Sequence, residues 1–274
     1  MPAREIDKLK ALTDNPEHIP GIYNYCDKWC ERCPFTARCS VFAMEAYDRT
    51  PGSRDPENEN FWKQLQGNLA ATVELLREMA EEAGVDLDTL VSPEDEARTE
   101  EVLRDTKAHP IVTTATDYTV AVHKWFQAAK GLFEGKAEDL NAKARMDLPN
   151  VDPEVEARDL KDATEVVRWY HTLISAKLRR AVQQNLTDRP ACLDGMPKDS
   201  DGSAKVALVC IDRSMAAWTR MREHLPEQED NILDFLVALE RLRRETQRVF
   251  PDARAFARPG FDDAATGPRD SAPR

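Results

Sequence analysis

The stretch that decides the fold is residues 152–186, DPEVEARDLKDATEVVRWYHTLISAKLRRAVQQNL. Asp152 and Pro153 are typical of an N-cap followed by the first helical residue. Apolar residues then recur every three or four positions, as on one face of an α-helix: Leu160, Ala163, Val167, Tyr170, Ile174, Leu178 and Ala181. The pattern predicts a helix that runs to about Leu186 and buries one face against other helices.

The rest of the chain repeats this pattern. An apolar stripe from Trp62 to Ala83 predicts a helix that ends before Gly84. Ser92 and Asp95, with Pro93 between them, have the spacing of a capping box, which predicts another helix start. Further stripes predict helices over 111–132, 204–225 and 232–242, with a loop over 187–202.

The composition agrees with a helical chain outside the membrane. Of its 274 residues 41% are hydrophobic, enough for a core, and only ten are glycine, few for a fold with many tight turns. No apolar run approaches the roughly 18 residues that a membrane-spanning helix needs. A formal charge of -12 disfavours binding to nucleic acid and to anionic lipid.

We therefore predict an all-α protein, an up-and-down bundle of five to six amphipathic helices with an N-terminal cysteine-rich metal-binding segment. The predicted parts are the cysteine-rich segment at 1–50, packed on the bundle, and the bundle at 51–250. The apolar pattern fades after Pro251, so residues 251–274 are predicted to be a disordered tail.

Four of the six cysteines, Cys26, Cys30, Cys33 and Cys39, lie within fourteen residues. The N-terminus lacks the apolar segment of a secretory signal, so we expect a reducing cytoplasm, where such a cluster is more often a metal or redox site than a set of disulfides. If residues 26–33 are helical, the first three sulfurs project from one face as a preformed ligand set. Pro34 then turns the chain and lets Cys39 return as the fourth ligand.

Sulfur-only coordination suits tetrahedral zinc or an iron–sulfur cluster and excludes calcium and magnesium. Structural zinc sites usually pair two cysteine knuckles across a longer spacer, so this compact spacing favours a 4Fe–4S cluster. Zinc is the alternative, followed by free thiols or a redox disulfide. Lys28, Arg32 and Arg38 are expected to favour thiolates. Four aromatic residues are expected to shield the sulfurs from water or to dock the loop: Tyr23, Tyr25, Trp29 and Phe35.

The loop from Cys30 to Cys39 resembles the three-cysteine iron–sulfur loop of RecB-like nucleases and the auxiliary-cluster loop of some radical-SAM maturases. The resemblance covers about ten residues, so it implies a 4Fe–4S cluster but not the fold, and no strand here matches the nuclease sheet. The triplet Cys26, Cys30 and Cys33 also matches the radical-SAM triad spacing, but Arg32 stands where that family usually has an aromatic residue, so we interpret this match as coincidental. The segment 22–39, together with residues 201–205 and 212–214, resembles an uncharacterised family of bacterial helical proteins, which implies a shared bundle and no known activity.

A second candidate site lies in the predicted bundle interior and combines His123, Glu165, His171 and Asp212. A single histidine beside an apolar stripe is more often a hydrogen-bonded packing residue, and Asp212 and Arg213 are each expected to need a partner on another element. Cys210 is expected to be a small core residue and Cys192 a loop thiol. The chain has no Glu-x-x-His pair and none of the common phosphate-loop, nucleophile-elbow or zincin motifs.

Three functions are therefore considered. The first is an iron–sulfur protein that uses its cluster for electron transfer, redox sensing or structure, with a redox or protein partner. The second is a non-catalytic interaction protein with a structural zinc at the same cysteines. The third is a bundle enzyme with a metal or polar site in the helical core.

Overall fold

The computed structural model describes residues 11, 15–47, 57–86, 92–146, 152–189 and 195–262. Within these ranges the chain is all-α, with eight helices, short 3-10 turns and no strand, where five or six helices were predicted. The chain divides into two compact units, one formed by Met1–Glu100 with Ala257–Arg274 and the other by Glu101–Phe256. None of the helices in the described ranges has the length and apolar character needed to cross a membrane.

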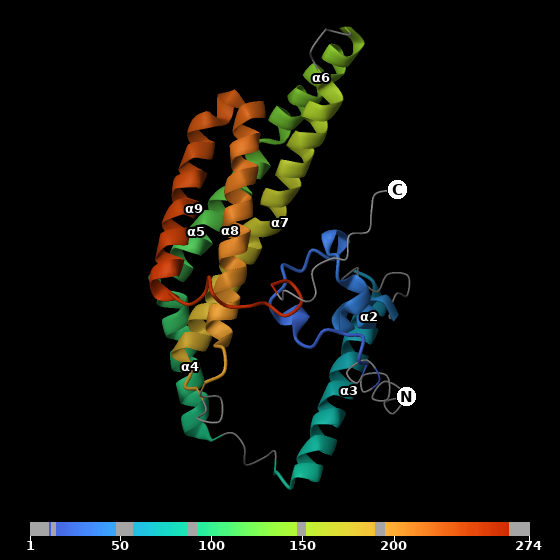
Figure 1. The fold of residues 1–274 in the computed structure, drawn as a ribbon, viewed down its shortest axis with the longest axis vertical. Coiled ribbons are helices and arrows are strands. Elements are labelled where there is room, and N and C mark those ends of the chain that lie inside the picture. Colours follow the sequence, from blue (N-terminus) through green and yellow to red (C-terminus); the bar gives the residue numbers. More distant parts are fainter. Residues whose placement is uncertain are drawn as a thin grey trace. The chain divides into compact units, whose positions relative to one another are not determined.

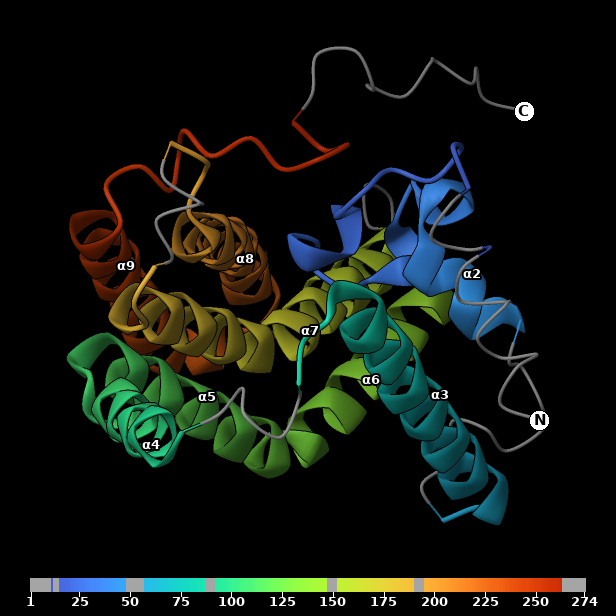
Figure 2. The ribbon, with the colours of Figure 1, turned by 90° about the horizontal axis from the view of Figure 1, so that it is seen from below.

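Four helices of the second unit form a closed ring: α5 (Pro110–Ala128), α7 (Pro153–Leu186), α8 (Asp199–His224) and α9 (Glu229–Val249). Helix α5 packs on α7, α7 on α8, α8 on α9 and α9 back on α5. Figure 1 shows α7, α8 and α9 alternating in direction, and Figure 2 shows the ring from one end. The predicted up-and-down bundle is confirmed for these helices, each of which buries an apolar face against two neighbours.

Two further helices lie outside the ring. Helix α4 (Pro93–Ala108) leads into the ring, and α6 (Lys130–Met146) packs beside α7. The sequence predicts one helix over 111–132, but α5 ends at Ala128 and α6 begins two residues later. Ala129 departs from helical geometry with ψ near 5°, and Gly131 follows it, so the backbone can change direction at little cost.

The predicted starts of α7 and α4 are confirmed by their caps. The Asp152 carboxylate accepts a hydrogen bond from the Val155 amide at 3.0 Å, which caps α7. At the start of α4, the Ser92 hydroxyl accepts from the Asp95 amide at 3.1 Å and the Asp95 carboxylate accepts from the Ser92 amide at 3.0 Å. This reciprocal pair is the predicted capping box. Helix α8 begins at Asp199, inside the predicted loop over 187–202.

An aromatic cluster forms the centre of the four-helix core. The Trp218 ring on α8 is fully buried and stacks on Phe235 of α9, with ring centroids 4.7 Å apart. Its indole N–H donates to the Tyr118 hydroxyl on α5 at 3.1 Å, which satisfies both buried polar groups. The Trp125 ring lies edge-on to Trp218 with centroids 5.2 Å apart. Because these rings come from three helices, they fix the relative positions of α5, α8 and α9.

The first unit contains α2 (Ser40–Tyr47), α3 (Glu59–Ala83) and the cysteine-rich loop. The helix predicted from the Trp62 stripe is confirmed as α3, and Gly84 ends it with a left-handed backbone at φ 67°. The stripe itself is not buried: Trp62, Leu69 and Met79 are 57%, 58% and 57% exposed. Helix α3 lies in the same unit as the N-terminal segment, whereas the predicted boundary at residue 51 placed it with the bundle.

The described part of the C-terminal segment, residues 251–262, is folded. Residues 251–262 form turns in which Ala253 is fully buried, so the prediction of disorder from residue 251 is wrong for this part. Its segment 257–262 belongs to the first unit. Residues 263–274 lie outside the described ranges, as do residues 1–10 and Cys192.

Candidate metal centre

The cysteine loop is a chain of tight turns and not the helix predicted over 26–33. Three 3-10 turns, Ile22–Asn24, Cys30–Arg32 and Thr36–Arg38, are separated by non-helical residues. Lys28 has φ 59°, and it is the one residue other than glycine with positive φ in the described ranges. A left-handed residue between the first two cysteines interrupts the helix and costs about 1–3 kcal/mol, a cost that is typical of functional loops.

The turns bring all four sulfur-bearing side chains to one place. Cys26, Cys30, Cys33 and Cys39 line a single cavity of about 30 Å³. By the same measure one water needs about 10–15 Å³, so the space exceeds that of a single water-sized body. The four cysteine side chains therefore share one cavity, which they reach through turns and not through one helix face.

The cysteine side chains that line the cavity are not arranged as a complete set of metal ligands. Within the described ranges, no three His, Cys, Asp or Glu side chains are arranged as the ligands of a metal ion. The preformed three-point set expected from a helix is therefore absent from this part of the chain. The reason is local, because the turn at Lys28 removes the i, i+4 relation between Cys26 and Cys30.

Main-chain groups hold the cysteines in place. The Phe35 amide donates to the Cys33 sulfur at 3.4 Å, and the Cys26 thiol donates to the Tyr23 carbonyl at 3.5 Å. Cys39 precedes α2, and its carbonyl accepts from the Ala43 amide in the first turn of that helix at 2.9 Å. Hydrogen bonds from amides to sulfur are among the contacts that tune sulfur-ligated clusters.

The electrostatics of the thiols differ from the prediction. Burial, the Glu45 carboxylate and the other three cysteines together raise the pKa of the Cys30 thiol. Burial also raises the pKa of Cys33, partly opposed by the hydrogen bond from the Phe35 amide. The expectation that nearby basic residues favour thiolates is therefore wrong for these two thiols. The Arg32 guanidinium lies over the Trp29 ring, 4.0 Å from its centroid, and Arg38 donates to the Glu17 carbonyl at 3.4 Å.

Aromatic side chains form much of the cavity wall. Tyr23 and Trp29 line it, as predicted, whereas Phe35 is buried in the small core with Ile19 and Ile22 beside it. Tyr25 is not among the lining residues in the described part of the chain. Phe42 and Phe261 also line the cavity, and sequence reasoning missed both.

Phe261 comes from the other end of the chain. Its ring meets Phe35 edge-on with centroids 5.1 Å apart, and the Arg258 guanidinium lies 4.9 Å from the Phe261 centroid. Arg258 also pairs with Asp262 at 2.9 Å, which closes this short turn. We call residues 258–262 the C-terminal clip. The Pro259–Gly260 pair is a turn signal in the sequence, but it does not identify the surface on which the turn packs.

Gly260 allows the clip to approach closely. Its φ is +77°, and an added Cβ would lie 2.9 Å from Ile19 Cδ1 and 3.0 Å from Ile22 Cδ1. We predict that Gly260→Ala costs about 2–4 kcal/mol, from left-handed strain and crowding together. The weakened clip should expose Cys33 more often, so alkylation of Cys33 in the reduced, metal-free variant should be at least about tenfold faster than in the wild type. Mass spectrometry measures the rate.

Gly84→Ala is the matched control for this substitution. Gly84 has φ +67°, but an added Cβ would meet nothing within 4 Å. Gly84→Ala therefore introduces backbone strain without crowding. Cys33 in this variant should be alkylated at the wild-type rate. Equal rates in both variants and wild type would show that the clip does not cover the cavity.

The second candidate site is not assembled. Asp212 accepts a bidentate hydrogen bond from Arg254 at 2.7 and 3.3 Å, and Glu165 pairs with Lys161 at 3.9 Å. The His171 ring donates to its own helix at the Arg168 carbonyl, 2.9 Å away. Burial, the largest cause, lowers the pKa of His171, and the nearby His123 lowers it further. These four side chains do not form a metal-binding group in the described structure.

The polar residues of α8 instead connect helices, as predicted. Asp212 reaches the Arg254 guanidinium in the C-terminal segment, and Arg213 donates to the Tyr170 hydroxyl of α7 at 2.6 Å. Cys210 is fully buried in the core, as expected for a small apolar side chain.

Comparison with protein-family models, with curated proteins and with solved structures finds no match to this chain. The resemblance of the cysteine loop to iron–sulfur loops therefore stays a prediction that depends on residues 22–39 alone.

Proposed function

We propose that this chain is a metalloprotein that holds an iron–sulfur cluster, most simply 4Fe–4S, through Cys26, Cys30, Cys33 and Cys39. The observation that carries the proposal is that all four side chains line one cavity. Thiolates are soft ligands that select zinc, copper(I) and iron–sulfur clusters over hard cations. The donor set therefore fits the cofactor that the spacing favours.

The spacing of the cysteines favours a cluster over a single zinc ion, and two features of the cavity are compatible with either metal site. The cavity walls include the rings of Tyr23, Trp29 and Phe261, which would limit the access of water to the sulfurs. The Phe35 amide points at the Cys33 sulfur, as expected where negative charge on a sulfur ligand is to be stabilised. The compact spacing leaves no room for the separate knuckles of a usual zinc finger.

The role of the residues around the cluster follows from their positions. When bound, the cluster would supply one-electron chemistry or a structural crosslink. The aromatic wall would keep water from the sulfurs, and the exposed surface near Lys28 would face a redox or protein partner. The proposed cluster needs its four cysteines as thiolates, which a reducing compartment such as the cytoplasm would maintain.

The experiment that tests the proposal is metal analysis of the full chain after anaerobic expression and purification. We expect a brown protein with about four iron and four acid-labile sulfide per chain. A colourless protein with one equivalent of zinc would refute the cluster and support a structural zinc site. A chain that retains neither metal after anaerobic reconstitution would refute both.

A further inference from the structure

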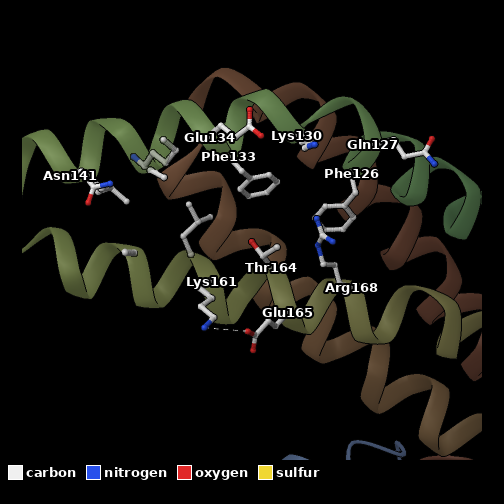
Figure 3. Close-up of a pocket in the computed structure, with 15 residues that line it drawn as sticks. Phe126, Gln127, Lys130, Phe133, Glu134, Asn141, Lys161, Thr164, Glu165 and Arg168 are labelled. Carbon is white, nitrogen blue, oxygen red and sulfur yellow. Dashed lines mark ion pairs between the residues drawn. The ribbon is translucent and has the colours of Figure 1, made fainter. Parts of the chain in front are cut away.

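A long apolar groove lies between α6 and the N-terminal half of α7, far along the chain from the cysteines (Figure 3). Its volume is about 920 Å³, which falls within the range of about 300–1,000 Å³ typical of small-molecule sites. Phe126, Leu140 and Leu160 line it and are 9%, 7% and 6% exposed. A groove of this size with an apolar floor can take up an elongated apolar molecule.

One end of the groove is aromatic. The rings of Phe126 and Phe133 stack at an angle of 18° with centroids 6.3 Å apart. The Arg168 guanidinium lies over the Phe126 ring, 4.4 Å from its centroid. Arg168 is thereby held at the mouth of the groove with its charge exposed to a ligand.

The same end carries unneutralised positive charge. Two other lysines that line the groove are already paired with carboxylates: Lys161 with Glu165 at 3.9 Å, and Lys136 with Glu156 at 2.5 Å. Neither Lys130 nor Arg168 forms an ion pair within the described ranges, and Figure 3 shows Arg168 against Phe126 and Lys130 on the opposite helix, α6. The Glu134 carboxylate also lines the groove, but Figure 3 shows it directed away from the space between the helices. An anionic group is therefore favoured at this end.

A buried hydroxyl lies next to this charge. Thr164 Oγ1 is buried and has no hydrogen-bond partner in the described structure. Leaving a buried hydroxyl without a partner costs about 1–3 kcal/mol. Thr164 and Arg168 are four residues apart on α7, so both lie on the face that lines the groove. Together they provide a hydroxyl donor and a guanidinium, which suit a carboxylate.

We infer that the groove binds a monocarboxylate with an unbranched apolar chain, such as a medium-chain fatty acid. Its carboxylate lies between Thr164 and Arg168, with Lys130 nearby, and its chain follows the floor past Leu160 toward Ala157. From Thr164 to Ala157 the floor runs about 10 Å along the helix. This length suits a chain of medium size, and burying its methylene groups supplies most of the affinity, at about 0.8 kcal/mol each.

The test is a titration of the full chain with decanoate, decanol and decyltrimethylammonium, followed by calorimetry and tryptophan fluorescence. Trp125 reports on the site, because its ring lies edge-on to Phe133 with centroids 6.0 Å apart. We expect decanoate to bind at least tenfold more tightly than decanol, and the cation more weakly still. Decanol or the cation binding as tightly as decanoate would overturn the proposal, as would no saturable decanoate binding up to about millimolar concentration.

Substitutions at Arg168 and Thr164 test where the decanoate carboxylate binds. Arg168→Gln and Thr164→Val should each weaken decanoate binding about five- to tenfold and leave decanol binding unchanged. Lys143→Gln is the matched control, because Lys143 is on α6 and pairs with Asp139 at 2.8 Å outside the groove. Equal decanoate affinity in all variants, with helical circular dichroism unchanged, would contradict the assignment. A chain that binds a helical peptide in the groove but no decanoate would also contradict it.

Discussion

Replacing Cys30 and Cys33 together by serine is expected to lower the iron and sulfide content of the anaerobically purified chain by more than tenfold. Both side chains line the cavity with Cys26 and Cys39, and both sulfurs are partly buried there. Serine is close in size, but its hydroxyl is a hard, poorly ionised ligand that replaces a soft thiolate. Changes in outer-shell partners alone already cost about 10–100-fold in metal affinity, so losing two ligands should cost more.

Cys210→Ala is the control for this prediction. Cys210 is fully buried in α8 and belongs to the other unit, so its loss should leave the iron and sulfide content unchanged. Iron, sulfide and zinc are measured on each variant, together with the visible spectrum. A double serine variant that keeps its metal, or a Cys210 variant that loses it, would show that the cofactor lies elsewhere.

Trp218→Ala is expected to lower the free energy of unfolding of the helical unit by about 4–5 kcal/mol. Trp218 is fully buried, and its ring packs on Trp125 and Phe235. Removing a large aromatic side chain from a core costs about 3–5 kcal/mol. The substitution also removes the donor to the Tyr118 hydroxyl, which then stays buried with one hydrogen bond fewer. Since domains usually have a free energy of unfolding of only about 5–15 kcal/mol, this substitution is expected to remove a large part of the stability of the unit.

The control is Trp169→Ala on α7, a tryptophan that is 36% exposed. This variant should lose less, about 1–3 kcal/mol, because more than a third of Trp169 already faces solvent. Chemical denaturation monitored by circular dichroism measures both. A loss for Trp218→Ala no larger than that for Trp169→Ala would show that the aromatic cluster is not the centre of the core.

Much of the helical unit was predictable because its signals are local. The caps at Asp152 and Ser92 depend on residues at most three positions away, and both form as predicted. The stripe of α7 repeats every three or four residues and is buried as expected, with Val167, Ile174 and Leu178 fully buried. The break between α5 and α6 was missed because a helical stripe continues across it.

The cysteine site was only partly predictable from the sequence. The spacing of the four cysteines indicated that they converge, and they line one cavity. A helix over 26–33 was wrong, since the left-handed conformation of Lys28 has no signal in its residue type. The buried surroundings, and so the raised pKa of Cys30 and Cys33, could not be inferred from neighbouring basic residues alone.

By itself, the sequence determined that the described chain is helical, where α4 and α7 begin, where α3 and α7 end, and which four cysteines line one cavity. Those properties follow from backbone hydrogen bonds and side-chain periods that span a few residues. Only the tertiary structure decided that Phe261 closes the cavity against Phe35, that the stripe of α3 stays exposed, and that Thr164 and Arg168 meet a groove beside α6. Those contacts join residues far apart in the chain or on different helices, so they depend on how the elements pack and not on the composition of any one of them.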